Sequence, residues 1–124
     1  MTRTIVAGSL ALVALLASGC TPNAPAASTD AHRLTVSATD EACTLSAPSA
    51  PSGTLTFAVT NSGTKANEFY LLNADNLAVV AEVEDIGPGL TREMVVSAAA
   101  GRYLAVCKPG MVGDGIRTPF EVTG

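Results

Sequence analysis

Apolar and polar residues alternate at every second position through most of the chain after residue 33, without the three- and four-residue spacing of a helix. The stretches RLTVSAT (33–39) and TLTFAVTN (54–61) are the clearest examples. A period of two is typical of a β-strand with one buried face. Further runs of strand character are EFYLLN (68–73), LAVVAEVEDI (77–86), TREMVVSA (91–98), GRYLAVC (101–107) and RTPFEVTG (117–124).

Turn-forming residues separate these runs. Proline, glycine, serine, asparagine and aspartate gather in PSAPSG (48–53), NSG (61–63), NADN (73–76) and GPG (87–89). The segment AAAG (98–101) is too short to nucleate a helix by itself. Seven or eight short strands at this spacing predict an all-β fold, an antiparallel sandwich or barrel.

The first twenty residues have the pattern of a bacterial export signal. Arg3 precedes an apolar run from Ile5 to Ala17, and two small residues then lead to Cys20. The run is too short for a good membrane span. Its end, LLASGC, resembles a lipoprotein lipobox, although Ala17 stands where leucine is usual. We expect cleavage before Cys20 and a lipid on its thiol, with ordinary secretion and a free Cys20 as the alternative.

These features divide the chain into a signal peptide at 1–19, a flexible tether at 20–32 that begins with lipidated Cys20, and one domain at 33–124. The tether is rich in proline, alanine, serine and threonine and has little to bury. The lipid would hold the exported protein at the outer face of the cytoplasmic membrane or in the periplasm. A net charge of −4 without a basic stripe argues against a nucleic-acid partner.

His32 is the only histidine, and it stands at the end of the tether. One imidazole cannot form a multi-histidine zinc site, and it leaves no nucleophile paired with a base. We expect His32 to be a solvated residue before the first strand, with metal ligation as the minor alternative. Because the sequence also lacks a cofactor motif, we expect no independent enzymatic turnover.

Two segments resemble a cupredoxin, and the first is VTNSGTKANEF (59–69). Cupredoxins commonly show an Asn-x-Gly turn after a strand, then a histidine at the mouth of the next strand, followed by a polar residue and phenylalanine. Asn61, Gly63 and Phe69 match this pattern. Asn67 stands at the histidine position.

The second segment is CKPGM (107–111), which follows the strand GRYLAV. In blue-copper proteins this strand ends at the cysteine ligand, and the loop beyond it carries a second histidine and often an axial methionine. Cys107 and Met111 match, but both histidines are missing. Since a blue-copper centre needs two imidazoles and a thiolate, type 1 electron transfer is not expected from this sequence.

Longer motifs are similar to one branch of the family, the EfeO-type cupredoxin-like domain of bacterial iron-uptake systems. They are TDEAC (39–43), NEFYL (67–71), EVEDIGPGLTREM (82–94) and CKPGMVGDGIRTPFEV (107–122). The resemblance implies a Greek-key sandwich, a part in iron or copper handling, and iron-transport components as partners. Fuller members continue into a helical domain with a His-x-x-Glu metal motif, which is absent here, so only the role of the β-domain is expected to carry over.

One interpretation of the remaining chemistry is a metal site at the pole of the sandwich where several strand ends converge. Soft sulfur ligands favour copper, above all Cu(I), whereas carboxylates suit Fe(III) or Cu(II). The candidate metal ligands are Cys43, Glu68, Cys107, Met111, Asp40 and Glu41, with Asp114 as a further carboxylate.

The other interpretation is a disulfide between Cys43 and Cys107. They are the only cysteines left once Cys20 is lipidated, and an even pair in an exported protein is usually bonded. The two interpretations are compatible, because a reduced pair could bind metal and an oxidised pair could release it. Either one requires the two sulfurs to lie close together.

A second acidic group, formed by Glu82, Glu84 and Asp85, has two interpretations as well. It could bind a cation, since Glu82 and Glu84 share one face of a continuous strand. We favour a solvated strand edge, on which charge discourages pairing with another chain.

The sequence therefore predicts a lipid-anchored cupredoxin-like module that binds copper or iron and assists metal uptake. The first alternative is a copper-dependent ferrous oxidase or an electron-transfer accessory. The second is a metal-free docking domain stapled by its disulfide.

Overall fold

A computed structural model describes residues 30–124, and its strands follow the alternation of buried and exposed positions. The signal peptide, the lipidation at Cys20 and most of the tether lie outside the described residues. The strands are β1 (Arg33–Ala38), β2 (Cys43–Leu45), β3 (Ser49–Pro51), β4 (Gly53–Asn61), β5 (Asn67–Asn73), β6 (Val79–Ile86), β7 (Thr91–Ala98), β8 (Gly101–Cys107) and β9 (Ile116–Thr123), with a 3-10 turn η1 (Pro109–Met111). In this part of the chain, no helix is long and apolar enough to cross a bilayer.

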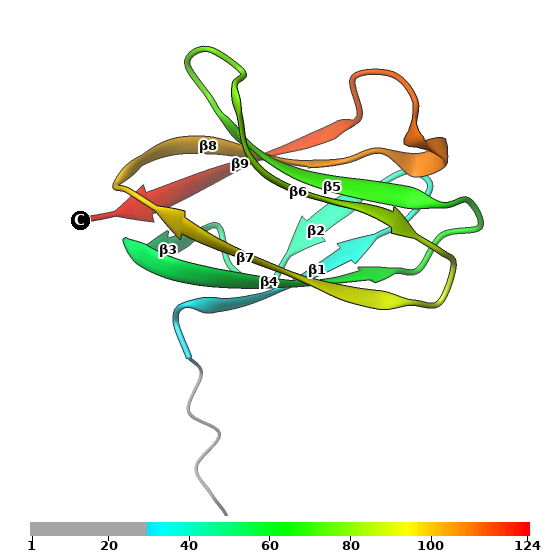
Figure 1. Cartoon of the computed structure of the whole chain (residues 1–124), viewed down its shortest axis with the longest axis horizontal. Coiled ribbons are helices and arrows are strands. Elements are labelled where there is room, and N and C mark those ends of the chain that lie inside the picture. Colours follow the sequence, from blue (N-terminus) through cyan, green and yellow to red (C-terminus); the bar gives the residue numbers. More distant parts are fainter. Residues whose placement is uncertain (1–29) are drawn as a thin grey trace, which may run out of the picture.

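The strands form two stacked sheets, which confirms the expected all-β sandwich (Figure 1). One sheet has the order β2-β1-β4-β7, and the other has the order β3-β9-β8-β5-β6. Phe57 lies between them, with its ring 5.5 Å from that of Phe69 and 5.6 Å from that of Phe120. Burial of each such side chain contributes about 1.5–3 kcal/mol to folding.

Two details of the expected fold are wrong. Residues 30–124 contain nine strands rather than seven or eight, and the sheets are mixed rather than wholly antiparallel. β1 pairs with β4 in parallel, and β3 pairs with β9 in parallel. The physical reason is a crossing of the chain between the sheets. β2 belongs to the sheet of β1 and β3 to the other, so the chain returns to β1 as β4 in the same direction.

The sandwich has two ends with different chemistry. We call one end the cysteine pole, because Ala38 ends β1 there, Cys107 ends β8, and Asn67 begins β5. It lies at the right of Figure 1, where β8 runs into η1. His32 precedes β1 and lies at the opposite end, beside Ser52. Ala38 lies six positions after His32, which corresponds to about 20 Å of strand.

Candidate functional site

Cys43 and Cys107 form a disulfide at the cysteine pole. Cys43 is paired with Ala38 at the end of β1, and Cys107 is paired with Phe69 of β5. Their Cα atoms are 5.5 Å apart although 64 positions separate them in sequence. Both are buried, with exposed fractions of 5% and 0%. The bond therefore staples the two sheets together.

The residues at this pole do not fit a blue-copper ion. The sulfur of Cys107 is bonded to carbon and to the other sulfur, so it is not a free thiolate. Asn67 stands where the resemblance to cupredoxins expects the first histidine, and His32 lies at the far end of β1. Without two imidazoles and a thiolate, the trigonal copper arrangement has no donors here.

Asn67 is the unusual polar residue of the pole. Its side chain is fully buried, and neither its Nδ2 nor its Oδ1 atom has a hydrogen-bond partner within residues 30–124. It pairs with Ile86 in the β5–β6 ladder, and side chains at alternate positions place it on the inner face with Phe69. A buried amide without partners costs about 1–3 kcal/mol.

Asn61 lies at the same pole with its amide fully used. Its Nδ2 atom donates to the carbonyls of Lys65 and Ile86, both at 2.7 Å. Its Oδ1 atom accepts from the backbone N–H of Gly63 at 2.9 Å. These bonds close the Asn-x-Gly turn and tie it to the end of β6.

Asp40 holds the same turn from outside. Its carboxylate accepts the Thr64 hydroxyl at 2.5 Å and the Thr64 N–H at 3.0 Å, and the Lys65 N–H lies at 3.4 Å. The bond from the Thr64 hydroxyl is the largest cause of a lowered pKa at Asp40. A side chain at Gly63 would collide with this carboxylate, since an added Cβ would lie 2.5 Å from Oδ1. Glu41, the next residue, is exposed.

Glu68 is not brought together with the disulfide. It follows Asn67 in β5, so its side chain lies on the outer face of the sheet, where it accepts a hydrogen bond of 2.8 Å from the Tyr70 hydroxyl. Burial, followed by the bond to Glu68, raises the pKa of Tyr70 far above its ordinary value. Tyr70 therefore stays protonated at physiological pH and acts as a donor.

Met111 lies in η1 and is 39% exposed. The loop around it is held against the start of β5, because the Gly110 N–H donates to the carbonyl of Ala66 at 2.7 Å. Asp114 is exposed farther along this loop. Within residues 30–124, no three or more histidine, cysteine, aspartate or glutamate side chains are grouped so that they could hold a metal ion.

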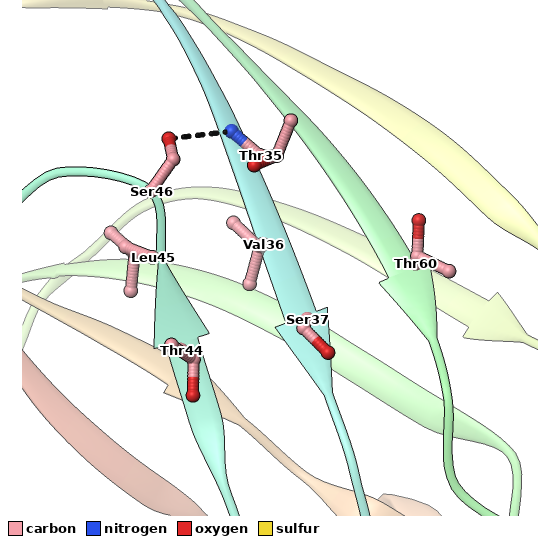
Figure 2. A pocket seen from close by; sticks show the side chains of 7 residues that line it. All are labelled: Thr35, Val36, Ser37, Thr44, Leu45, Ser46 and Thr60. Carbon is pink, nitrogen blue, oxygen red and sulfur yellow. Dashed lines mark hydrogen bonds between the residues drawn. The ribbon is translucent and has the colours of Figure 1, made fainter.

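Two further features complete the placement of the polar candidates. Glu82, Glu84 and Asp85 are exposed on β6, the edge strand of its sheet, as a solvated edge requires. A hollow of about 250 Å³ beside β1 and β2 is lined by hydroxyls and apolar groups without a titratable side chain (Figure 2).

One contact was not predicted from the sequence: the Nζ atom of Lys108 lies over the ring of Tyr70, 4.4 Å from the ring centroid. This contact depends on the pairing of β5 with β8, where Tyr70 lies opposite Val106, and no local pattern signals it. The alternation in NEFY signals only that Glu68 and Tyr70 share a face.

Comparison with known proteins agrees with this geometry. The profile of the family described as "Cupredoxin-like domain" matches residues 9–117. A solved structure of dithionite-reduced auracyanin from the photosynthetic bacterium Roseiflexus castenholzii superposes with a TM-score of 0.59 at 16% identity, covering 75% of this chain and 98% of that one. Identity this low supports a common fold alone. No curated protein matches the sequence.

Proposed function

This chain belongs to the cupredoxin-like domain family, and from that premise we propose that it is a tethered extracytoplasmic docking module of a metal-uptake system, without a blue-copper centre. The observation that carries the proposal is the disulfide between Cys107, at the ligand position of the family, and Cys43. An electron-transfer role would need that sulfur as a thiolate together with imidazoles. With Cys107 held in the disulfide, the domain presents surfaces for binding a partner but no thiolate for redox chemistry at a bound metal.

The cellular setting of this proposal comes from the sequence. The export signal and the lipobox-like segment before Cys20 favour a lipid-anchored protein outside the cytoplasm. The motifs shared with EfeO-type domains, above all CKPGMVGDGIRTPFEV (107–122), favour iron-transport components as its partners. We expect binding without turnover, because the sequence has a single histidine and no cofactor motif.

Intact mass and metal content, measured on protein purified without a histidine tag, test the proposal. The expected result is a mass two hydrogen atoms below that of the fully reduced protein, with no stoichiometric metal. Stoichiometric copper or iron in the oxidised protein would contradict it. Oxygen-dependent oxidation of Fe(II) that requires added copper would instead support the ferrous-oxidase alternative.

A second candidate function is thiol-gated binding of a soft metal ion, and the unpartnered amide of Asn67 favours it. Reduction would expose two thiolates, from Cys43 and Cys107, beside a buried amide that has no partner within residues 30–124. Two thiolates are ligands that suit Cu(I).

The test of this second function is a Cu(I) titration before and after mild reduction. Binding of one ion by the reduced protein alone, lost in Cys107→Ser, supports it. The Glu68→Gln variant is a matched control, because Glu68 lies on the outer face and its loss should leave the affinity unchanged. Failure of the reduced protein to bind Cu(I) would rule this function out.

A further inference from the structure

The outer face of the five-stranded sheet carries an apolar row that crosses four strands. Leu72 of β5 is paired with Val79 of β6 on one side and with Leu104 of β8 on the other, and Leu104 is paired with Pro119 of β9. Leu72, Leu104 and Pro119 lie on the face away from the core, because they alternate with the core-facing positions of their strands. A register shift between Leu71 and Leu72 brings Val79 beside Leu72 on this face, and both line the same hollow. The row spans three inter-strand spacings, about 14 Å.

Two loops rise on either side of this row. Figure 1 shows the β5–β6 loop and the β8–β9 loop projecting from the five-stranded sheet, away from the other layer. Leu77 of the first loop, Val79 at the start of β6, and Gly113 and Asp114 of the second loop line one hollow of about 210 Å³. A second, separate hollow of about 370 Å³ lies at the other end of the row, where Leu104 and Pro119 line it among other residues. We call this face, the apolar row with a hollow at each end, the trough.

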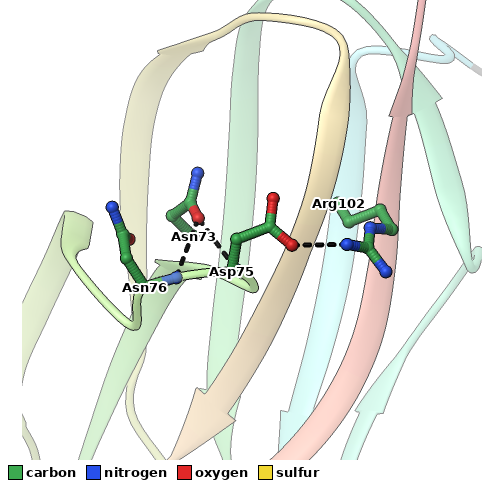
Figure 3. Close-up of polar contacts among 4 residues, drawn as sticks. All are labelled: Asn73, Asp75, Asn76 and Arg102. Atoms are coloured by element: carbon green, nitrogen blue, oxygen red, sulfur yellow. Dashed lines mark hydrogen bonds and ion pairs between the residues drawn. The ribbon is translucent and has the colours of Figure 1, made fainter.

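The wall formed by the β5–β6 loop is fixed by polar contacts. Asn73 Oδ1 accepts the backbone N–H groups of Asp75 at 2.9 Å and Asn76 at 3.3 Å, and Asp75 forms an ion pair with Arg102 (Figure 3). These bonds leave Leu77 at the side of the trough with an exposed fraction of 46%. An exposed leucine on a loop tied down in this way is available to a partner without reordering of the loop.

The opposite wall is fixed by close packing. Gly115 has a φ of +76°, and an added Cβ there would lie 2.6 Å from the Val106 side chain and 2.8 Å from the Cys107 carbonyl. Only glycine permits both the backbone conformation and this approach. The loop therefore lies pressed against the sheet, and Val112 is left 73% exposed above it.

The smaller hollow of the trough carries two cations, one of which, Lys108, lies over the ring of Tyr70, and one carboxylate, the exposed Asp114. Lys108 and Arg117 both line the smaller hollow, together with Tyr70 and Leu72. Within residues 30–124 neither of them has a carboxylate oxygen within 4.0 Å, whereas Arg33 and Arg102 are both ion-paired. In a chain of net charge −4, two such cations beside an apolar row fit an occupant that combines apolar side chains with a carboxylate.

We propose that this trough binds a short segment of a partner protein in which apolar residues flank a glutamate or aspartate. The carboxylate lies between Lys108 and Arg117, and the apolar side chains pack on the row from Val79 to Pro119. An extended segment of about four residues covers the row, since each residue advances about 3.3 Å. The inference rests on the proposed docking function and gives that function a surface and a partner chemistry.

The test uses the oxidised full chain in detergent micelles, labelled with ¹⁵N, and the peptide acetyl-Leu-Glu-Leu-Leu-amide as probe. We expect saturable shifts of the amides of Leu77, Lys108 and Gly113. The peptide with glutamine in place of glutamate should bind at least fivefold more weakly. Arg117→Gln should weaken the glutamate peptide at least threefold, whereas Arg92→Gln, an exposed arginine on β7, should leave its binding unchanged.

Several results would overturn the inference. Equal binding of the glutamine peptide, or of a lysine peptide, would remove the role of the two cations. Shifts confined to the hollow beside β1 and β2 would place the site elsewhere, and the absence of shifts would leave no site for such a segment. None of these results alters the mass and metal content that test the proposed function, so the two can fail independently.

Discussion

Asn61 and Asn67 are two fully buried asparagines at the cysteine pole. They differ in how many hydrogen bonds their amide groups form. Asn61 makes three bonds that close a turn and hold the end of β6. Asn67, which stands where the family has its first histidine, makes none within residues 30–124. The comparison teaches that one buried amide at this pole holds the turn together, whereas the other, at the position where the cupredoxin resemblance expects a histidine, has no such structural role within the described residues.

The largest expected effect comes from removing the disulfide that lies at this pole. Cys43→Ala combined with Cys107→Ala should lower the free energy of unfolding by about 4 kcal/mol, because the bond closes a loop of 64 residues. Urea denaturation measures the loss, and the reduced wild-type protein is the matched control. A loss below about 1 kcal/mol in both proteins would show that the staple is not a major support of the fold.

Asn61→Leu should have the next largest effect. The substitution leaves the carbonyls of Lys65 and Ile86 and the N–H of Gly63 without their partner. Since each unsatisfied buried group costs about 1–3 kcal/mol and the turn can admit some water, we expect a total loss of about 3 kcal/mol. Urea denaturation at pH 7 is again the measurement. Stability within about 0.5 kcal/mol of wild type would remove Asn61 as a framework residue.

Asn67→Leu is the matched substitution on the other side of the comparison. It should raise the free energy of unfolding by about 1 kcal/mol, because a buried amide without partners is replaced by an apolar group of similar volume. Thermal or urea unfolding of the oxidised protein measures the change. A clear loss of stability would mean that the amide has a partner, such as a buried water, and would erase the contrast with Asn61.

The smallest expected effect concerns Asp40, which supports the turn from the surface. Its pKa is lowered by the hydroxyl and N–H of Thr64, so the folded state favours the carboxylate. This contribution is present above the ordinary pKa of 3.8 and disappears as the pH falls through the lower pKa of the folded state. Unfolding measured from pH 6 down to pH 2 should show this acid loss in wild type. The same loss in Asp40→Asn would contradict the prediction.

The strands could be predicted from the sequence because most of them have one buried face. Alternation located β1 and the six longer strands from β4 to β9, but β2 and β3 have only three residues each, too few to show a period. The parallel pairing of β1 with β4 depends on a crossing between sheets, and no local pattern encodes it. Long-range pairing is set by the packing of both layers rather than by any one segment.

The sequence predicted the geometry of the site only for the two cysteines, because a disulfide or a shared metal ion requires their sulfur atoms to be close together. Cys43 and Cys107 had to lie close together under either interpretation, and they are bonded. Glu68 was grouped with them although it follows Asn67 directly in a strand, and alternation places it on the outer face. The missing partners of Asn67 could not be predicted, because they depend on every segment that packs around the pole.

The parallel pairing of β1 with β4 has a mechanical consequence for a domain held through its N-terminus. A pull on the tether enters the domain at Arg33 and runs along β1, whose register with β4 extends from Arg33 to Ala38. Under this load the ladder hydrogen bonds are stressed together in shear, instead of opening one after another as in a peeled hairpin. Beyond Ala38, the force meets β2 and the covalent link from Cys43 into the second sheet. The domain is thus built to resist a pull applied at its N-terminal end, which is the end that the proposed lipid anchor would load.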